Sequence, residues 1–587
     1  MLRKTLSIAT LSFIAIAFLA AVAFGSSSPM EKGNFFKKQA NALKNVKRFA
    51  AGAEQATGYS TITTGGEQAL GYDAIVSNSP GIQIGTSTYD LQSNTRMNRQ
   101  VSWRGTKDIH MIWMRSTDSN AAAADLDRGT GYNAWDASEG EFYFAGGCDV
   151  HPRLGGGTNY SGYVSLDVDT EGKAVISNHH DEGAGYHSTV WYDFGVASCF
   201  FSPYKRPLPD SVMKYPIPPE HAEPDREMIW PQHEYQVYNG DTVTHMVSAH
   251  SPADGTAAQV IAYFRRVGSD TLGAWDYPPM LLDTIQTICQ SVAASRATAK
   301  VAIAWGAPPG AFPGSNESLT RDDLDDGLGS SQRFNEIFVM YSDDMGSSWT
   351  PKENITDHDS TVGGWLNHGD ISMLIDTDDN LHILMSMREI LPTSASDEGG
   401  YGEYAHFWGS RLWHWDELNG VKRPVKDANW DLPDSGCTGG AWNEMSIVKP
   451  SLSECDGKFY AFFVQFNDIY NGIDNDCHDG NYTGAYTFNT ANGEIWMSVS
   501  NDGGYSWDLA RNLTNTYTSH CWQNESHAPL PVCESDHYVS STRFGMDITG
   551  GNYPTENIVD PTGSYTGNYY IDVTYMNDKF PGSVMQD

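Results

Sequence analysis

Short apolar runs joined by turn residues recur along most of the chain. In seven places an apolar run is followed by an acidic or glycine-containing turn and then by a second apolar run, which often opens with histidine. This alternation over short segments is typical of β-hairpins. The predicted hairpins span residues 101–113, 164–176, 235–247, 292–305, 371–385, 447–463 and 545–573.

A second repeat is more specific. Residues 336–356 and 494–514 share one frame, and both contain the pattern S-x-D-x-G-x-S-W. In such a turn the Asp side chain accepts N–H bonds, the glycine permits a positive φ, and the tryptophan packs across the hairpin. The pattern consists of Ser342, Asp344, Gly346 and Trp349 in the first copy and of Ser500, Asp502, Gly504 and Trp507 in the second.

This pattern resembles the Asp-box, or bacterial neuraminidase repeat, of sialidase-like β-propellers. The resemblance implies an all-β fold of four-stranded antiparallel blades, in which the hairpins are the inner strands and the Asp-box turns join the outer strands. The hairpin count favours seven blades, and six is the alternative if the first or second hairpin belongs to an insertion. Little chain follows the seventh hairpin, so residues 81–91 are expected to supply its outer strands and close the ring.

Composition narrows the range of partners. The 587 residues include 73 acidic and 37 basic side chains, a formal net charge of −36. Such a charge argues against binding to nucleic acid or to an anionic membrane surface. The 57 Gly, 30 Tyr and 17 Trp suit short strands joined by turns better than long surface helices.

The N-terminus predicts export. Arg3 and Lys4 precede an apolar stretch over residues 6–24 that ends in the small residues 21–23. Residues 1–25 are therefore expected to be a cleaved signal peptide, with an uncleaved membrane anchor as the alternative. Residues 26–58 are expected to be a linker or short helix and residues 59–587 the propeller. The protein would then be secreted, periplasmic or on the cell surface.

Eight cysteines in an exported chain permit up to four disulfides. Cys521 and Cys533 are close enough in sequence to close one loop and are the favoured pair. Cys437 with Cys455 is the next choice. The alternative is that the cysteines are buried free thiols.

The resemblance also implies a test for catalysis. Sialidases use an arginine triad for the substrate carboxylate, a tyrosine nucleophile assisted by a glutamate, and an acid/base aspartate. The first arginine normally lies in an F/Y-R-I/L-P motif. The nearest string here, Tyr204-Lys205-Arg206-Pro207, has an extra residue before the arginine and a proline in the aliphatic position. No catalytic residue is assigned.

Candidate binding residues lie near the ends of the predicted strands. His110, His245 and His382 open equivalent strands, where a repeated histidine indicates packing inside a blade more than a ligand. Side chains further along can face a channel mouth, and two similar segments, 363–368 and 439–444, can present others to the channel. The binding candidates are Arg115, His179, His250, His368, Arg388 and Glu444. The alternative for each is a solvated loop position.

One acidic segment suggests a cation site. Asp474, Asp476 and Asp479 alternate before a glycine, and carboxylates at this spacing can wrap Ca²⁺. The segment resembles the D-N-D-C-D-G metal-binding motif of secreted bacterial proteins, with His478 inserted. The alternative is a solvated acidic loop.

Two function classes follow. The first is an exported binding or scaffold propeller for extracellular glycans or cell-envelope partners, which the degraded arginine motif favours. The alternative is a sialidase-like glycoside hydrolase, an exo-sialidase. The fold alone does not separate the two classes, because propellers carry both.

Overall fold

The computed structural model places twenty segments of the chain. They are residues 79–89, 91–93, 96–116, 128–150, 161–181, 186–202, 207, 227–251, 259–269, 273–285, 289–307, 335–357, 364–390, 405–428, 437–438, 445–467, 489–490, 492–516, 534–553 and 569–578. The expected signal peptide and linker lie outside them. Every regular element in these segments is a β-strand, so they contain no helix that could cross a membrane.

The first three sheets come from the N-terminal half of the propeller and are antiparallel throughout. Blade 1 contains β1 (Val101–Ser102), β2 (Ile109–Arg115), β3 (Gly129–Asp136), β4 (Glu141–Phe142) and β5 (Cys148–Asp149). Blade 2 contains β6 (Ser161–Val168), β7 (Ala174–Asp181) and β8 (Tyr186–Tyr192). Blade 3 contains β9 (Glu227–Tyr238), β10 (Asp241–Ser251), β11 (Gln259–Val267), β12 (Ala274–Trp275) and β13 (Met280–Ile285).

The next three sheets have four strands each in consecutive spatial order. Blade 4 contains β14 (Gln290–Ala294), β15 (Val301–Ala307), β16 (Glu336–Ser342) and β17 (Glu353–Asn354). Blade 5 contains β18 (Gly364–Ile375), β19 (Leu381–Ile390), β20 (Ala405–Asp416) and β21 (Lys422–Asp427). Blade 6 contains β23 (Ile447–Cys455), β24 (Lys458–Asn467), β26 (Asn492–Ser500) and β27 (Arg511–Asn512).

Three smaller sheets complete the described strands. The pair β28 (Ser535–Ser541) and β31 (Val573–Asp578) is antiparallel, as is the pair β29 (Met546–Asp547) and β30 (Tyr569–Tyr570). The pair β22 (Cys437–Thr438) and β25 (Asn489–Thr490) is parallel.

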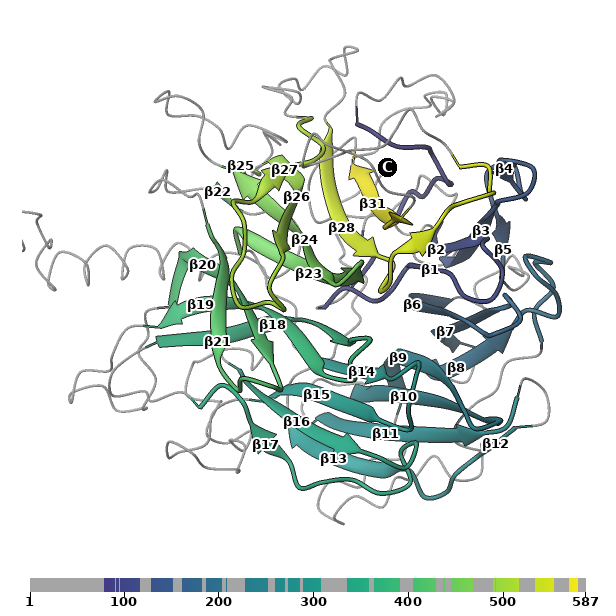
Figure 1. Ribbon diagram of the computed structural model, residues 1–587, viewed down its shortest axis with the longest axis horizontal. Helices are drawn as coiled ribbons and strands as arrows, with labels where there is room; N and C mark the ends of the chain where they lie inside the picture. Colours follow the sequence, from purple (N-terminus) through teal and green to yellow (C-terminus); the bar gives the residue numbers. More distant parts are fainter. Residues whose placement is uncertain are drawn as a thin grey trace, which may run out of the picture. The chain divides into compact units, whose positions relative to one another are not determined.

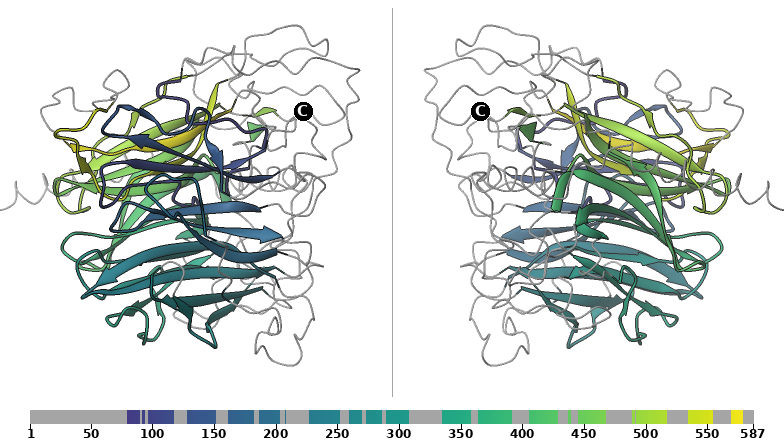
Figure 2. Two further views of the ribbon diagram at one scale, coloured as in Figure 1. Left: turned by 90° about the vertical axis from the view of Figure 1, so that its right-hand side faces the viewer. Right: turned by 90° about the vertical axis from the view of Figure 1, so that its left-hand side faces the viewer.

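The sheets form a β-propeller, because their first strands follow one another around a common axis in chain order (Figure 1). Hydrogen bonds join neighbouring first strands: Leu166 N donates to Arg99 O at 2.9 Å, and Val292 N donates to Gln232 Oε1 at 3.0 Å. Figure 2 shows the strands of the teal sheets lying roughly side by side. The predicted all-β propeller fold is confirmed.

The blade count differs from the favoured expectation of seven. Six sheets have three to five strands, which agrees with the alternative count of six blades. Instead of a seventh blade, the described residues of the C-terminal region form two two-stranded sheets: β29 with β30 inside the seventh predicted hairpin, and β28 with β31, which lies between blade 6 and blade 1. Ser541 N donates to Ser451 Oγ of blade 6 at 3.0 Å, and Gln100 N of blade 1 donates to Ser540 Oγ at 2.9 Å.

The ring closes through side chains and not through the expected strand from residues 81–91. The described residues of this segment form no strand. Instead Ser79 Oγ lies 2.8 Å from Tyr575 Oη on β31, and Trp113 Nε1 donates to Thr86 O at 3.1 Å on the blade 1 side. The terminal segments are therefore neighbours, as predicted, but without a shared strand ladder.

Both S-x-D-x-G-x-S-W turns join the third and fourth strands of their blades, as predicted. In each turn the first serine accepts from the glycine N–H and the aspartate accepts from the second serine. The bonds are Gly346 N to Ser342 Oγ, Ser348 N to Asp344 Oδ1, Gly504 N to Ser500 Oγ and Ser506 N to Asp502 Oδ1, all 2.8 Å. The two turns are therefore the same structural unit.

First strands are mostly buried, because a neighbouring blade covers each face. Every residue of β6 and of β23 is buried. The apolar core lies between blades: one cluster joins Ile112 of blade 1, Leu166 of blade 2 and Ile229 of blade 3.

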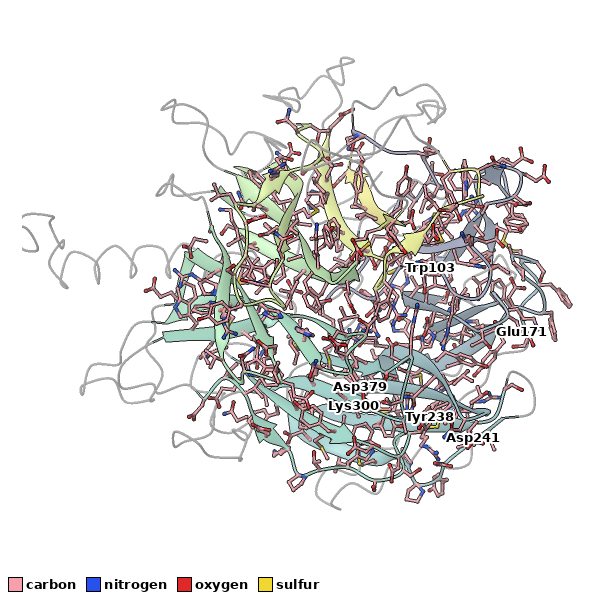
Figure 3. The ribbon with its side chains drawn as sticks, in the orientation of Figure 1. Trp103, Glu171, Tyr238, Asp241, Lys300 and Asp379 are labelled. Carbon is pink, nitrogen blue, oxygen red and sulfur yellow. A yellow bond between two sulfur atoms is a disulfide. The ribbon has the colours of Figure 1, made fainter. Side chains whose placement is uncertain are left out.

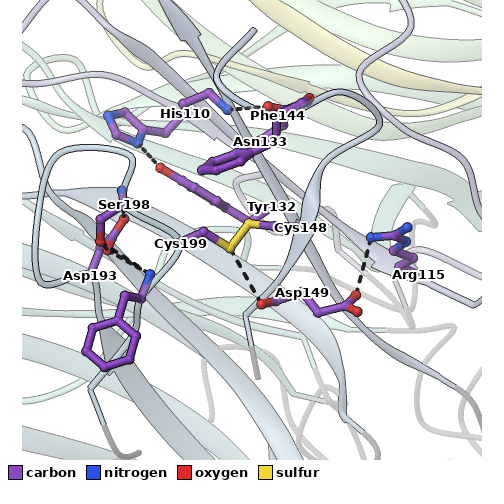
Figure 4. Close-up of a disulfide and its surroundings, with 12 residues drawn as sticks. His110, Arg115, Tyr132, Asn133, Phe144, Cys148, Asp149, Asp193, Ser198 and Cys199 are labelled. Atoms are coloured by element: carbon purple, nitrogen blue, oxygen red, sulfur yellow. Dashed lines mark hydrogen bonds and ion pairs between the residues drawn. A yellow bond between two sulfur atoms is a disulfide. The ribbon is translucent and has the colours of Figure 1, made fainter. Parts of the chain in front are cut away.

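A disulfide joins blade 1 to blade 2. Cys148 in β5 and Cys199 after β8 are bonded, with their Cα atoms 6.6 Å apart (Figure 4). The expected Cys437–Cys455 pair is wrong, because Cys455 ends β23 as a buried free thiol packed against Gly545. Cys289 is the other free thiol found in the described ranges. The expected Cys521–Cys533 pair lies outside the described residues.

Candidate functional site

The two ends of the propeller differ in the strands that they connect. The hairpin end is where first and second strands are joined, and the loop end is where second strands lead to third strands. The S-x-D-x-G-x-S-W turns lie at the hairpin end, since Met345 N donates to Ala299 O of the β14–β15 hairpin at 3.0 Å. The predicted binding residues that belong to described strands lie toward the loop end.

Two of these predicted residues are described with their side chains and their partners. Arg115 is partly buried at the end of β2, where its Nη1 lies 3.4 Å from Asp149 Oδ1. His179 in β7 is fully buried, with its Nε2 3.3 Å from Arg128 Nη2 and its ring 4.9 Å from the Tyr163 ring. Burial and Arg128 hold the pKa of His179 well below its usual range. His179 is therefore a neutral interior group.

The other predicted residues are not brought together in the described part of the molecule. Arg388 is buried in β19, 4% exposed. His250 and His368 belong to β10 and β18, but their side chains are not described. Glu444, Arg206 and the acidic residues Asp474, Asp476 and Asp479 lie outside the described residues. Among the placed segments no three His, Cys, Asp or Glu side chains are grouped closely enough to hold a metal.

The repeated histidines are packing elements, as interpreted from the sequence. His110 Nδ1 lies 2.7 Å from Tyr132 Oη, and His245 Nδ1 lies 2.7 Å from Tyr263 Oη. Burial lowers the pKa of His110 to about 4 and, with Arg265, that of His245 to about 3. Each ring is neutral and hydrogen-bonded inside its own blade.

A cluster of interacting charged side chains lies on the propeller axis at the hairpin end. Arg99, which precedes β1, donates to Asp167 Oδ1 of β6 at 2.9 Å and also to Glu234 of β9. Arg543, which follows β28, lies 2.5 Å from the same Glu234 oxygen. Asp167 also accepts from Tyr235 N at 2.8 Å. The cluster thus ties blades 1, 2 and 3 to the β28–β31 sheet.

Two more arginines extend this cluster without contacting an acid. Arg104, in the hairpin after β1, donates to Tyr235 O at 2.9 Å. Arg296, in the hairpin after β14, donates to Trp103 O at 3.3 Å. We define the axial cluster as Arg99, Arg104, Asp167, Glu234, Arg296 and Arg543.

Burial and mutual charge set the protonation of the acids in the axial cluster. The guanidiniums of Arg99, Arg104 and Arg296 lower the pKa of Asp167 well below its usual range, against the opposing effect of burial. Burial raises the pKa of Glu234 to about 7, although Arg543 and Arg99 act in the other direction. Asp167 is therefore the permanent anion and Glu234 the titrating one.

A smaller charged group lies nearer the loop end. Lys449 of β23 places Nζ 3.3 Å from Asp370 Oδ1 of β18, and its backbone N donates to Asp370 Oδ2 at 3.1 Å. Arg96 is buried nearby, and its Nε and Nη2 make no hydrogen bond with the described residues. Burial raises the pKa of the neighbouring Cys289 thiol to about 12, which favours its neutral thiol form at neutral pH.

The axial cluster was not predicted from the sequence. Its members are spread over residues 99–543 and share no motif. The sequence held one clue to the axial cluster, which is the position of two of its arginines. Arg104 and Arg296 each lie just after a first strand, where the predicted hairpins turn.

Comparisons with known proteins give structural neighbours only. No protein-family model and no curated protein matches the chain. Similar solved structures include a GH62 α-L-arabinofuranosidase catalytic domain of Coprinopsis cinerea, with 10% identity, 59% of this chain and 99% of that chain covered, and a TM-score of 0.28. A Hadza microbial sialidase has 10% identity over 71% and 68% of the two chains, with a TM-score of 0.31. A mutant Trypanosoma rangeli sialidase with trans-sialidase activity has 10% identity over 67% and 57%, with a TM-score of 0.33. At these TM-scores the neighbours add nothing to the fold, which rests on the sheets themselves.

Proposed function

We propose that this protein is an exported β-propeller that binds extracellular glycans or cell-envelope partners, in preference to the alternative of a sialidase-like glycoside hydrolase. The choice rests on how the carboxylates near the axis are used.

Three of the buried carboxylates on the first strands are each held by a cation. Asp167 is held by Arg99, Glu234 by Arg99 and Arg543, and Asp370 by Lys449. Glycoside hydrolysis generally needs one carboxyl group that is free to protonate the leaving oxygen and a second group that faces the sugar. Acids fixed in buried ion pairs support rigidity more than proton transfer.

Exposed aromatic rings support a carbohydrate ligand. Phe200 is 69% exposed, Tyr505 64% and Tyr277 59%. Tyr505 also packs over Arg423, whose Cζ lies 4.3 Å from the ring centroid. Planar rings with a polar edge suit stacking against sugars, and a guanidinium beside such a ring can contact hydroxyl or carboxylate groups.

Retention on immobilised polysaccharides tests this proposal, with the chain lacking residues 1–25 as the sample. Tyr505→Ala should weaken retention, whereas Leu509→Ala should not, because Leu509 is a 92% exposed aliphatic residue of the same turn region. A separate assay measures hydrolysis of a fluorogenic sialoside by the same sample. Turnover that is abolished by Arg206→Ala would replace the binding proposal with the hydrolase alternative.

A further inference from the structure

The axial cluster carries more positive than negative charge. Its cations are Arg99, Arg104, Arg296 and Arg543, and its anions are Asp167 and Glu234. The chain as a whole has a formal charge of −36. A local excess of guanidinium groups inside so acidic a protein requires an explanation.

The excess positive charge of the axial cluster comes from Arg104 and Arg296. Within the described ranges neither side chain forms an ion pair, and the one hydrogen bond of each is to a backbone carbonyl, Tyr235 O and Trp103 O respectively. Arg296 Cζ lies 4.5 Å from the Phe544 ring centroid and 5.8 Å from that of Trp103. The aromatic rings hold the Arg296 guanidinium in place without neutralising it.

Both arginines lie at the hairpin end and are only partly buried. Figure 3 shows Trp103 inward of Glu171 and Asp241, which belong to the β6–β7 and β9–β10 hairpins. The site is thus on the propeller face that carries the S-x-D-x-G-x-S-W turns, away from the candidate residues at the loop end.

This arrangement is electrostatically unfavourable as it stands. Burial and the neighbouring Arg104 lower the pKa of Arg296 to about 9, and burial and Arg99 lower that of Arg543 to about 10. Like charges that repel across a partly desolvated space favour a counterion that supplies opposite charge and hydrogen-bond acceptors. Guanidinium groups match the geometry of oxyanions, which can accept two parallel N–H bonds from each.

We propose that Arg104 and Arg296 bind a small oxyanion, a carboxylate, sulfate or phosphate group, at the hairpin end of the propeller axis. Arg99 and Arg543 hold the two acids in place. The oxyanion is either a free ion or a group carried by an acidic sugar. The site is independent of the glycan surface proposed above.

Melting curves of the chain lacking residues 1–25 test this site, with sodium sulfate compared with sodium chloride at equal ionic strength. Sulfate stabilises proteins in general through exclusion from their surface, and that effect rises without saturating. Specific binding adds a saturable rise in Tm. We expect this saturable rise in the parent and its loss in Arg104→Gln and in Arg296→Gln.

Arg511→Gln is the matched control, because Arg511 is an exposed arginine of β27. It should keep the saturable rise. Glucuronate and glucose replace sulfate in a second series. A saturable rise with glucuronate but not with glucose supports a carboxylated sugar, and a rise with sulfate alone supports a free ion. No saturable rise in the parent, or an equal rise in Arg104→Gln and Arg296→Gln, would overturn the proposal. If Arg296→Gln does not fold, Arg104→Gln alone decides.

Discussion

Gly504 of blade 6 lies directly against the imidazole ring of His414 in blade 5. A Cβ placed on Gly504 would come within 2.1 Å of His414 Cε1, and His414 Nδ1 lies 3.1 Å from Gly504 O. An equivalent contact links blades 3 and 4, where a Cβ on Gly346 would lie 2.0 Å from Tyr263 Oη. The glycine of the repeated turn is therefore a contact between blades as well as a residue with positive φ.

This contact predicts a difference between two adjacent glycines. Gly503 and Gly504 have φ values of 74° and 86°, but a Cβ on Gly503 would meet nothing within 4 Å. Gly503→Ala should cost about 1 kcal/mol of unfolding free energy, the backbone term alone. Gly504→Ala should cost at least about 2 kcal/mol, because His414 must also move.

Urea unfolding of the two variants measures this difference. Equal losses of stability would show that the His414 ring yields freely and that the glycine serves only the turn.

The turn was predictable from the sequence, whereas its role between blades was not. The spacing of Ser500, Asp502 and Gly504 encodes local hydrogen bonds. The contact with His414 depends on how two sheets pack, and no local pattern records that.

The corresponding turns of blades 1 and 5 are also held by an aspartate, but with a different hydrogen-bond spacing. Asp136 Oδ1 of blade 1 accepts from Ser138 N, and Asp416 Oδ1 of blade 5 accepts from Asn419 N, both at 2.8 Å. These turns lack the full serine–glycine–tryptophan pattern, so the repeat was visible in only two copies. The Cys148–Cys199 disulfide was missed for a related reason, since partners that are distant in sequence meet only after two blades have packed.

The pH dependence of stability should reflect two carboxyl groups between blade 6 and the β28–β31 sheet. Thr516 Oγ1 donates to Asp536 Oδ2 at 2.6 Å, and Thr516 N donates to Glu494 Oε1 at 2.8 Å. Burial raises the pKa of Glu494 to about 7 and raises that of Asp536, against the hydrogen bonds from Thr514 and Thr516. Tyr575 interacts electrostatically with Asp536, Glu494 and Glu534, and His537 and Asp578 also lie on this side.

The folded chain therefore holds a proton on Glu494 between its unfolded pKa and pH 7, where the unfolded chain has lost it. This stabilisation is complete below the unfolded pKa and is lost as pH rises toward 7. Glu494→Gln should flatten the dependence of Tm on pH and raise stability at pH 8 by on the order of 1 kcal/mol.

Glu336 provides the control, because it occupies the equivalent position in blade 4 but interacts electrostatically with Lys422, where it opposes the lowering of the Lys422 pKa by burial. Glu336→Gln should lower stability at pH 8. A gain in both variants would mean that general surface charge, and not the Glu494–Asp536 pair, causes the effect.

The cost in unfolding free energy of losing the Glu234–Arg543 ion pair should be largest when only one of the two partners is replaced. Arg543→Gln leaves Glu234 with Arg99 alone, and Glu234→Gln leaves Arg543 without its acid. Breaking a buried pair typically costs about 3–5 kcal/mol. The double variant should cost less than the sum of the single ones, with a coupling of about 1–3 kcal/mol in urea unfolding. Additive losses would show that the two side chains act independently.

The disulfide between Cys148 and Cys199 should stabilise the first two blades. The bond closes a loop with a sequence separation of 51 residues. Loop-closure entropy predicts a contribution of up to about 4 kcal/mol, so reductant should lower Tm. Cys455→Ala keeps this sensitivity to reductant, because Cys455 is a free thiol. Without reductant, Cys148→Ser should have a lower Tm than Cys455→Ala. Its Tm should also fall less than that of Cys455→Ala when reductant is added. If both variants respond equally, the stabilising disulfide is a different one.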